Sequence, residues 1–263
     1  MKPLPLSRAL DEFALTAALL FAVVTVVRWL RDPGSPLYIG GLQAALAVIG
    51  PLSGLILYGL ILSPPGRRSG GHLNPAVTLG LWLMDVFPGA SVLPYTIGQL
   101  AGSAAGTALA WAVWGSGVSS PAVHFTALRP APNWGSAAVF LAEAGCLIVL
   151  VVLVGFFLAY PAYHRWLPQA IGGALAVFIV VLGPLSGASA NPARQFGPAL
   201  LSGHTAYLWI YLLAPEVGAV FGAAVHHLLY RRLQTKAPLT YKLAAASASA
   251  KGASASAKEV NPS

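Results

Sequence analysis

The chain has 263 residues, of which 57% are hydrophobic and only 8% are charged, and its formal net charge is +8. A water-soluble domain would carry roughly 25% charged residues, so the composition excludes that class and predicts a polytopic membrane protein. The excess of positive charge is assigned to loops and tails on one side of a membrane, and no nucleic-acid partner is expected.

Six apolar runs are long enough to cross a hydrocarbon core of roughly 30 Å. In chain order, the predicted spans cover residues 13–29, 37–62, 93–114, 137–160, 167–185 and 206–230. Two further apolar runs, 75–87 and 192–201, are too short to cross a bilayer alone and are expected to be half-helices. The expected fold class is therefore an all-α membrane protein.

Each short run follows a loop rich in serine and glycine, and the two loops are copies of one another. Residues 69–76 read Ser-Gly-Gly-His-Leu-Asn-Pro-Ala, and residues 186–193 read Ser-Gly-Ala-Ser-Ala-Asn-Pro-Ala. Glu12 and Glu143 mark the start of the first span in each half. Because each copy has three full spans, an odd number, the repeats over about 12–115 and 136–232 are expected to be inverted.

The distribution of basic residues predicts the orientation in a plasma or inner membrane. Three arginines fall on one side, Arg28, Arg31 and Arg129. Eleven basic residues fall on the other, namely Lys2, Arg8, Arg67, Arg68, Arg165, Arg231, Arg232, Lys236, Lys242, Lys251 and Lys258. The positive-inside rule then places both termini in the cytoplasm. We expect residues 1–11 to be a short cytoplasmic segment and residues 233–263, rich in alanine and serine, to be a disordered cytoplasmic tail.

The two Asn-Pro-Ala motifs predict the centre of a pore. Proline is favoured at the first position of a helix and asparagine is a good N-cap, so each motif indicates a helix start. In an inverted repeat the two starts meet at mid-membrane, where the positive ends of both helix dipoles disfavour cations. The pore-centre residues are Asn74, Pro75, Ala76, Asn191, Pro192 and Ala193, with the two asparagine side chains as donors.

The residues before each asparagine are expected to be non-helical. Exposed carbonyl groups at that depth are tolerated only along a water-filled cavity. The expected ladder of carbonyl acceptors comprises Gly70, Gly71, His72, Leu73, Ala188, Ser189 and Ala190. Such a ladder suits a file of water or small neutral solutes. No cofactor and no metal ion is expected.

Three charged residues are expected at membrane depth. Arg194, which follows the second Asn-Pro-Ala, is predicted to offer donors to a solute and to repel cations and protons. Glu12 and Glu143 are predicted to accept hydrogen bonds from N–H groups of the two loops and so hold the carbonyl ladder. The alternative role for both carboxylates is a proton relay in an ion-coupled secondary transporter. An intramembrane enzyme has little support, because the spans contain no paired nucleophile and base and no metal-binding spacing.

Together these motifs resemble the aquaporin and aquaglyceroporin family over about residues 11–232. The resemblance implies an hourglass fold of six transmembrane helices and two re-entrant half-helices in an inverted repeat. It also implies a homotetramer with one pore per protomer and passive transport without a cofactor. Residues 183–189 (GPLSGAS) and 197–199 (GPA) look like the nodulin-26-like branch and its bacterial relatives.

In that family four positions form the outer constriction. Counting 20 residues back from Asn74 and 12 and 3 back from Asn191 indicates Gly54, Ile179 and Ala188, and Arg194 is the fourth. One insertion before Asn74 would put Ser53 or Leu55 in place of Gly54. A constriction of this kind would be wide and moderately apolar. It favours glycerol, urea and boric, silicic or arsenous acid alongside water, and a water-selective channel is the alternative.

Overall fold

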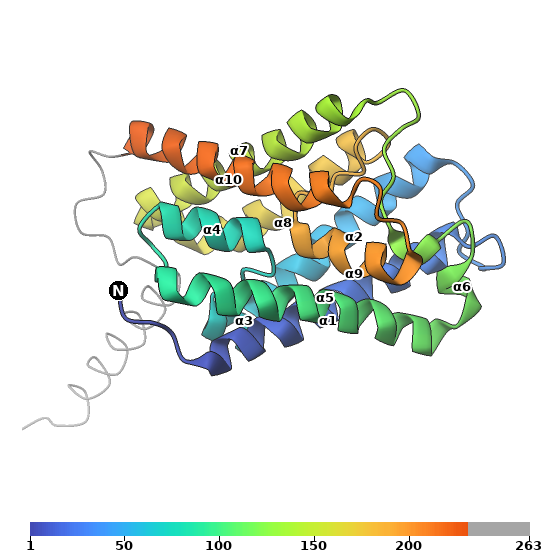
Figure 1. The fold of residues 1–263 in the computed structure, drawn as a ribbon, viewed down its shortest axis with the longest axis horizontal. Helices are drawn as coiled ribbons and strands as arrows, with labels where there is room; N and C mark the ends of the chain where they lie inside the picture. The colour runs from blue at the N-terminus through green and yellow to red at the C-terminus, as the bar shows by residue number, and fades with distance from the viewer. Residues whose placement is uncertain (231–263) are drawn as a thin grey trace, which may run out of the picture.

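The computed structural model describes residues 1–230, so the tail expected at 233–263 lies outside the described residues. Six long helices run side by side (Figure 1): α1 (Leu6–Arg31), α2 (Leu42–Leu62), α5 (Val92–Trp114), α7 (Ser136–Ala159), α8 (Leu167–Leu182) and α10 (Leu208–Tyr230). The two half-helices are α4 (Pro75–Leu83) and α9 (Pro192–Ser202). Short connecting turns are α3 (Pro64–Ser69), η1 (Gly89–Ser91), α6 (Ser116–Ser119), η2 (His124–Thr126) and η3 (Pro161–Trp166).

Within the described residues, five helices are long and apolar enough to cross a membrane: α1, α2, α7, α10 and the continuous stretch Pro161–Leu182 that contains α8. The sixth expected span is α5, which has the length but is less apolar. Its polar side chains Gln99, Ser103 and Thr107 are all buried inside the bundle. These polar side chains of α5 therefore face the protein interior. The half-helices lie there, together with the two loops that precede them, residues 70–74 and 187–191, which we call the pore loops.

Glycine allows the long helices to approach closely. A Cβ added to Gly98, Gly102 or Gly106 of α5 would lie within 2.5 Å of a backbone carbonyl oxygen of α1. The spacing of four residues puts the three glycines on one face, as in other close membrane helix pairs. In the second half, an added Cβ at Gly218 of α10 would lie 2.2 Å from the Ala144 carbonyl oxygen of α7. The pairs α1 with α5 and α7 with α10 are thus equivalent contacts of the two repeats.

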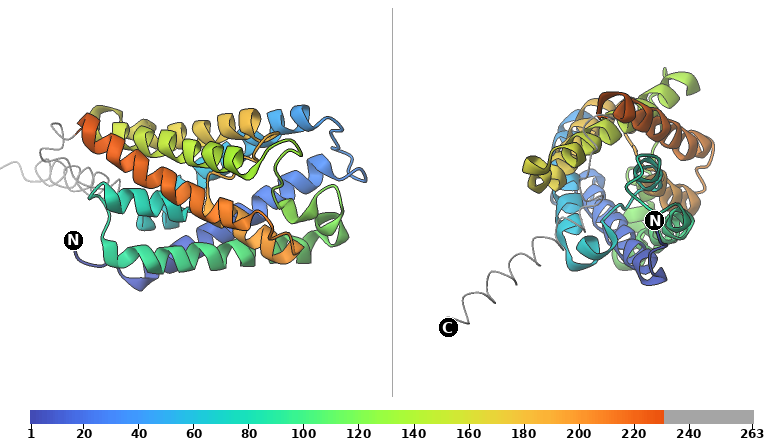
Figure 2. Two further views of the ribbon diagram at one scale, coloured as in Figure 1. Left: turned by 45° about the horizontal axis from the view of Figure 1, so that its top comes forward. Right: turned by 90° about the vertical axis from the view of Figure 1, so that its left-hand side faces the viewer.

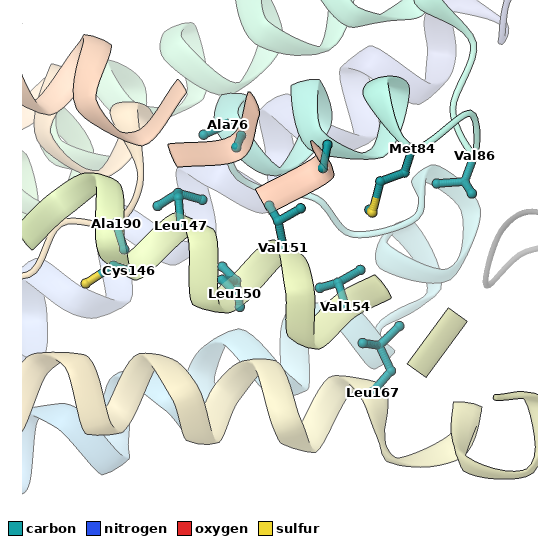
Figure 3. Packing of buried hydrophobic residues seen from close by; sticks show 12 residues of the cluster. Ala76, Met84, Val86, Cys146, Leu147, Leu150, Val151, Val154, Leu167 and Ala190 are labelled. Atoms are coloured by element: carbon teal, nitrogen blue, oxygen red, sulfur yellow. The ribbon is translucent and has the colours of Figure 1, made fainter. Parts of the chain in front are cut away.

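The two half-helices enter the bundle from opposite ends and point their N-termini at each other (Figure 1). In the end-on view the long helices form a ring with α4 inside it (Figure 2). The largest buried cluster runs along α7 and includes Leu147 and Val151, together with Ala76 of α4 and Ala190 of the second pore loop (Figure 3). Cys146 is buried in the same cluster. This packing supports α4 and the second pore loop from one side.

Candidate functional site

The two asparagines of the Asn-Pro-Ala motifs are cross-linked through the opposite loops. Each side-chain oxygen caps its own half-helix: Asn74 Oδ1 accepts from the Ala76 N–H at 2.9 Å, and Asn191 Oδ1 from the Ala193 N–H at 2.9 Å. Each side-chain nitrogen donates across the centre, from Asn74 to the Ala190 carbonyl and from Asn191 to the Leu73 carbonyl, both at 2.8 Å. A primary amide has two N–H groups, so one N–H of each asparagine is left to bond a solute.

The pore loops share one backbone conformation. Positive φ angles occur at Gly70, Gly71 and Leu73 (102°, 62° and 49°). They recur 117 residues later at Gly187, Ala188 and Ala190 (94°, 50° and 47°). Non-glycine residues rarely adopt this region, so Leu73, Ala188 and Ala190 are held there by their surroundings.

A cavity of about 280 Å³ follows these loops. Its lining includes both asparagines and Arg194, and six residues of the expected ladder, namely Gly71, His72, Leu73, Ala188, Ser189 and Ala190. Gly70 lies instead on a second cavity of about 330 Å³, which also contains Gly71 and His72 and is bordered by the N-terminal residues. The two cavities therefore meet at the first pore loop.

Two buried carboxylates hold the loops in equivalent ways. The carboxylate of Glu12 accepts hydrogen bonds from the N–H groups of His72 (3.0 Å) and Leu73 (2.7 Å) and from the Ser69 hydroxyl (2.6 Å). Neither this carboxylate nor that of Glu143 is exposed. Their charge is thus spread over several donors, which is how a buried carboxylate is tolerated.

Glu143 repeats this pattern in the second half. Its carboxylate accepts from the N–H groups of Ser189 (3.1 Å) and Ala190 (2.7 Å) and from the Ser186 hydroxyl (2.8 Å). The N–H groups that it binds belong to residues whose carbonyls were expected to form the ladder. Holding a peptide group by its N–H also fixes the direction of the neighbouring carbonyls, so each glutamate is placed to orient a ladder.

Sequence reasoning missed three side chains that complete these supports. The hydroxyl of Tyr95 donates to the Ser69 carbonyl at 2.8 Å, and that of Tyr211 to the Ser186 carbonyl at 2.5 Å. Gln99 donates to Glu12 at 2.8 Å and to the Thr78 hydroxyl at 3.1 Å. The two tyrosines could have been found by extending the comparison of the repeats to the third span of each half.

Arg194 is half-buried beside the cavity, and its guanidinium donates to the Thr126 carbonyl at 2.7 Å. Thr126 belongs to η2, which sequence reasoning had not connected to the pore. Next along the chain, Leu128 and Gln195 are joined by two hydrogen bonds. The loop between α6 and α7 therefore forms part of the wall beside Arg194.

The structure corrects the position of Gly54. This residue faces α8 and not the cavity: a Cβ there would lie 2.3 Å from the carbonyl oxygen of Gly172. Ser53, the alternative that one insertion would bring into place, lines the cavity together with Ile179, Ala188 and Arg194. The reason is helix packing, since α2 and α8 can approach closely only where a glycine lies at their contact. A count of residues from Asn74 does not register that requirement.

A basic cluster lies beyond Arg194, in the loops outside the spans. Nε2 of His204 lies 3.2 Å from Nε2 of His124 and also contacts a guanidinium nitrogen of Arg129. Burial lowers the pKa of His124, and the charges of His204 and Arg129 lower it further. Residues 1–230 contain no group of three or more histidine, cysteine, aspartate or glutamate side chains arranged to hold a metal ion.

A family model described as "Major intrinsic protein" matches residues 4–226, nearly the whole of the described chain. This chain belongs to the major intrinsic protein family. The expected resemblance to aquaporins is thereby confirmed, as is the expectation that the chain is not an enzyme. Members of this family are channels, so the ion-coupled transporter that the inverted repeat had left open is set aside.

Several curated members of the major intrinsic protein family are similar to this chain. The probable aquaporin AqpM of Archaeoglobus fulgidus is 36% identical, covering 72% of this chain and 75% of the relative. The propanediol uptake facilitator PduF of Citrobacter freundii is 32% identical, covering 72% and 85%. Nodulin-26 of Glycine max is 36% identical, covering 66% and 64%. The relatives thus include proteins of several named types.

Comparison with a solved structure confirms the fold. The aquaglyceroporin from Plasmodium falciparum matches with a TM-score of 0.75, covering 88% of this chain and 100% of that chain. The sequences are 21% identical, so this likeness concerns the fold alone. The chain is a multi-pass, all-helical membrane channel protein with the aquaporin fold.

Proposed function

We propose that this protein is a passive channel for water and for small uncharged solutes such as glycerol, urea and boric, silicic or arsenous acid. The observation that carries the proposal is the lining of the cavity of about 280 Å³, here called the outer cavity. Ser53, Ile179 and Ala188 line it together with Arg194. None of the first three has an aromatic ring. We therefore expect the opening beside the guanidinium to be bounded by small or aliphatic groups, which suits solutes larger than water.

The centre of the cavity supports exclusion of ions. The N-termini of α4 and α9 meet where Asn74 and Asn191 bond across the centre. The positive ends of the two helix dipoles there favour neutral molecules and disfavour cations. Arg194 adds a positive charge in the same cavity. Glu12 and Glu143 already accept three or more hydrogen bonds each, which suits a structural role better than proton relay.

The printed names of the relatives agree with this range of solutes. One relative is named for propanediol, a three-carbon diol, and others are named aquaporins. A pore that admits a three-carbon diol needs room similar to that for glycerol. This similarity supports the proposal for this chain without naming its physiological solute.

Stopped-flow light scattering on proteoliposomes tests the proposal. Vesicles with the protein are expected to take up glycerol, urea and boric acid faster than empty vesicles, and a protonophore should leave these rates unchanged. Water flux without faster uptake of the larger solutes would refute the proposal and support the water-selective alternative. Flux abolished by the protonophore would refute passive transport.

We further propose a homotetramer in the cell membrane, with both termini in the cytoplasm. Residue 1 and the end of α10 lie at the same end of the bundle (Figure 1), as an even number of spans requires. Many large apolar side chains on the outer faces of the long helices are exposed, including Leu55, Leu109, Leu141, Val149, Leu213 and Leu228. These faces suit contact with lipid or with neighbouring protomers.

Two measurements test this arrangement. Native mass spectrometry from detergent should give four times the mass of one chain, and a monomer would refute the assembly. Because Cys146 is buried, a cysteine introduced as Lys2→Cys can be labelled selectively. Labelling of intact cells by an impermeant maleimide would refute the cytoplasmic N-terminus.

A further inference from the structure

The wall beside Arg194 contains a strained backbone segment. His124, Phe125 and Thr126 have φ angles of 50°, 55° and 62°, in the left-handed region that non-glycine residues rarely enter. Three such residues in succession persist only where the surrounding structure holds them. The last of them provides the carbonyl that accepts from Arg194. Whatever holds this segment therefore also determines where the guanidinium lies.

The buried side chain of Gln195 holds the chain next to this segment, at Leu128. The Leu128 N–H donates to Gln195 Oε1 at 2.9 Å, and Gln195 Nε2 donates to the Leu128 carbonyl at 3.3 Å. A carboxamide can accept and donate at once, as a neighbouring strand would, whereas an ionised carboxylate or a thioether cannot. Gln195 is 1% exposed, so water cannot replace these bonds. One residue, Ala127, separates the clamped Leu128 from Thr126.

The clamped residue also contacts the second pore loop. A Cβ added to Gly187 would lie 2.9 Å from the Cβ of Leu128, so these residues already lie in close contact. Three residues later, the Ala131 N–H donates to the Leu185 carbonyl at 2.8 Å. Within the strained segment itself, Phe125 is buried and packs edge-on against Trp111. The clamp by Gln195 thus lies between two further anchors of the same loop.

We propose that Gln195 is a positioning residue for permeation: its carboxamide clamps the backbone of Leu128, this holds the Thr126 carbonyl, and that carbonyl orients Arg194. The inference rests on the proposed function and deepens it, because it identifies what fixes the donor at the outer constriction. Without the clamp, the guanidinium gains conformational freedom. A polyol must bond several fixed groups at once, so its passage loses more than that of water.

The test compares Gln195→Met with a matched control, Gln43→Met, in proteoliposomes. Both substitutions remove a carboxamide that donates to a backbone carbonyl, but Gln43 bonds Val180 at the exposed outer end of α2 and does not line the outer cavity. We expect Gln195→Met to lower the ratio of glycerol to water permeability at least about threefold, because both hydrogen bonds to Leu128 are lost. Gln43→Met should leave this ratio unchanged. An unchanged ratio in Gln195→Met overturns the inference.

A double variant distinguishes positioning from a general structural role. If Gln195 acts through Arg194, Gln195→Met should have no further effect on the ratio in an Arg194→Val background. An equal reduction in both backgrounds overturns the inference. Should Gln195→Met fail to fold, Gln195→Glu replaces it, because glutamate keeps the size and the acceptor but loses the donor to Leu128.

Failure of the proposed function is a separate result. A wild-type channel that passes water but no glycerol refutes the proposed solute range, and proton permeability then becomes the readout for the clamp. A displaced guanidinium of Arg194 is a weaker barrier to protons. Gln195→Met should therefore raise proton permeability about threefold. Proton permeability equal to that of Gln43→Met would overturn the inference.

Discussion

Two adjacent residues of α2 have different surroundings. Ser53 lines the outer cavity, whereas its neighbour Gly54 contacts the backbone of α8. A large side chain at position 53 would therefore enter the permeation path, and a side chain at position 54 would separate two helices. The two positions are adjacent in sequence, but substitutions at them should have different kinds of effect.

We expect Ser53→Trp to reduce glycerol flux at least about tenfold and water flux less, because the added ring narrows the opening beside Arg194. Gly54→Leu should instead lower the melting temperature in detergent, because an added Cβ would lie 2.3 Å from the Gly172 carbonyl oxygen. Stopped-flow scattering and thermal unfolding by intrinsic fluorescence measure the two effects. Equal loss of water and glycerol flux in Ser53→Trp would contradict this assignment.

Glu143 provides a second prediction at the residue scale. Glu143→Gln keeps the shape but puts an amide N–H toward N–H or O–H donors, so at least one hydrogen bond of about 1.5–3 kcal/mol is lost. We expect a lower melting temperature and reduced solute flux. If the variant keeps wild-type stability, the carboxylate does not support the loop.

At the scale of secondary-structure elements, the long helices pack closely because small residues face the neighbouring helices. Along α5, Gly98, Gly102 and Gly106 contact the backbone of α1, whereas an added Cβ at Gly145 of α7 would meet nothing within 4 Å. This contrast separates the packing role of a glycine from its poor helix propensity. It also explains why composition alone does not identify the glycines that matter.

Gly102→Ala and Gly145→Ala form the matched pair for this contrast. An added Cβ at Gly102 would lie 2.4 Å from the Phe13 carbonyl oxygen, so we expect destabilisation by about 1–3 kcal/mol. Gly145→Ala should be neutral or stabilising by up to about 1 kcal/mol, because alanine is the better helix former. Denaturation in mixed micelles compares the two variants. Equal stability would show that α1 and α5 can separate without cost.

The stability of the loops at the outer end of the bundle should depend on pH. The pKa of His124 lies below its ordinary value, so the folded cluster of His124, His204 and Arg129 favours the neutral imidazole. The unfolded chain then binds more protons in this range, and the stability of the cluster is present above a pH of about 6.5 and declines as pH falls. Tm should decrease between pH 7.5 and 5.5, and less so in His124→Gln. The same decrease in both proteins would rule out this cluster as the cause.

At the scale of the whole molecule, two half-helices from opposite repeats share one centre. Their crossed amide bonds, from Asn74 to Ala190 and from Asn191 to Leu73, join the two halves through the pore itself. The positive ends of two helix dipoles and the charge of Arg194 act on the same cavity. The proposed exclusion of cations therefore depends on the assembled repeat and not on either half alone.

Arg194→Val tests how much of this exclusion belongs to the guanidinium. We expect proton permeability to rise several-fold while water permeability stays within about twofold, because the dipoles of α4 and α9 remain. A pH-sensitive dye inside proteoliposomes reports the proton flux. An unchanged proton leak would assign exclusion to the half-helix termini alone.

The sequence by itself determined the class of the molecule, its inverted repeat, its two half-helices and the charged residues at membrane depth. These features follow from apolar runs, helix-start residues and repetition, which are local or can be compared along the chain. Glu12 and Glu143 could be matched to their loops because a buried carboxylate needs donors, and the repeats offered equivalent N–H groups.

Only the tertiary structure decided which face of α2 meets the pore and which loop bonds Arg194. Ser53 and Gly54 differ by one position, and the choice depends on how closely α8 packs, which no local pattern records. The contacts of Arg194 with Thr126 and of Gln195 with Leu128 join residues 67 or more positions apart. They depend on a left-handed segment at 124–126 that helix and strand propensities do not predict, because neighbouring elements impose it.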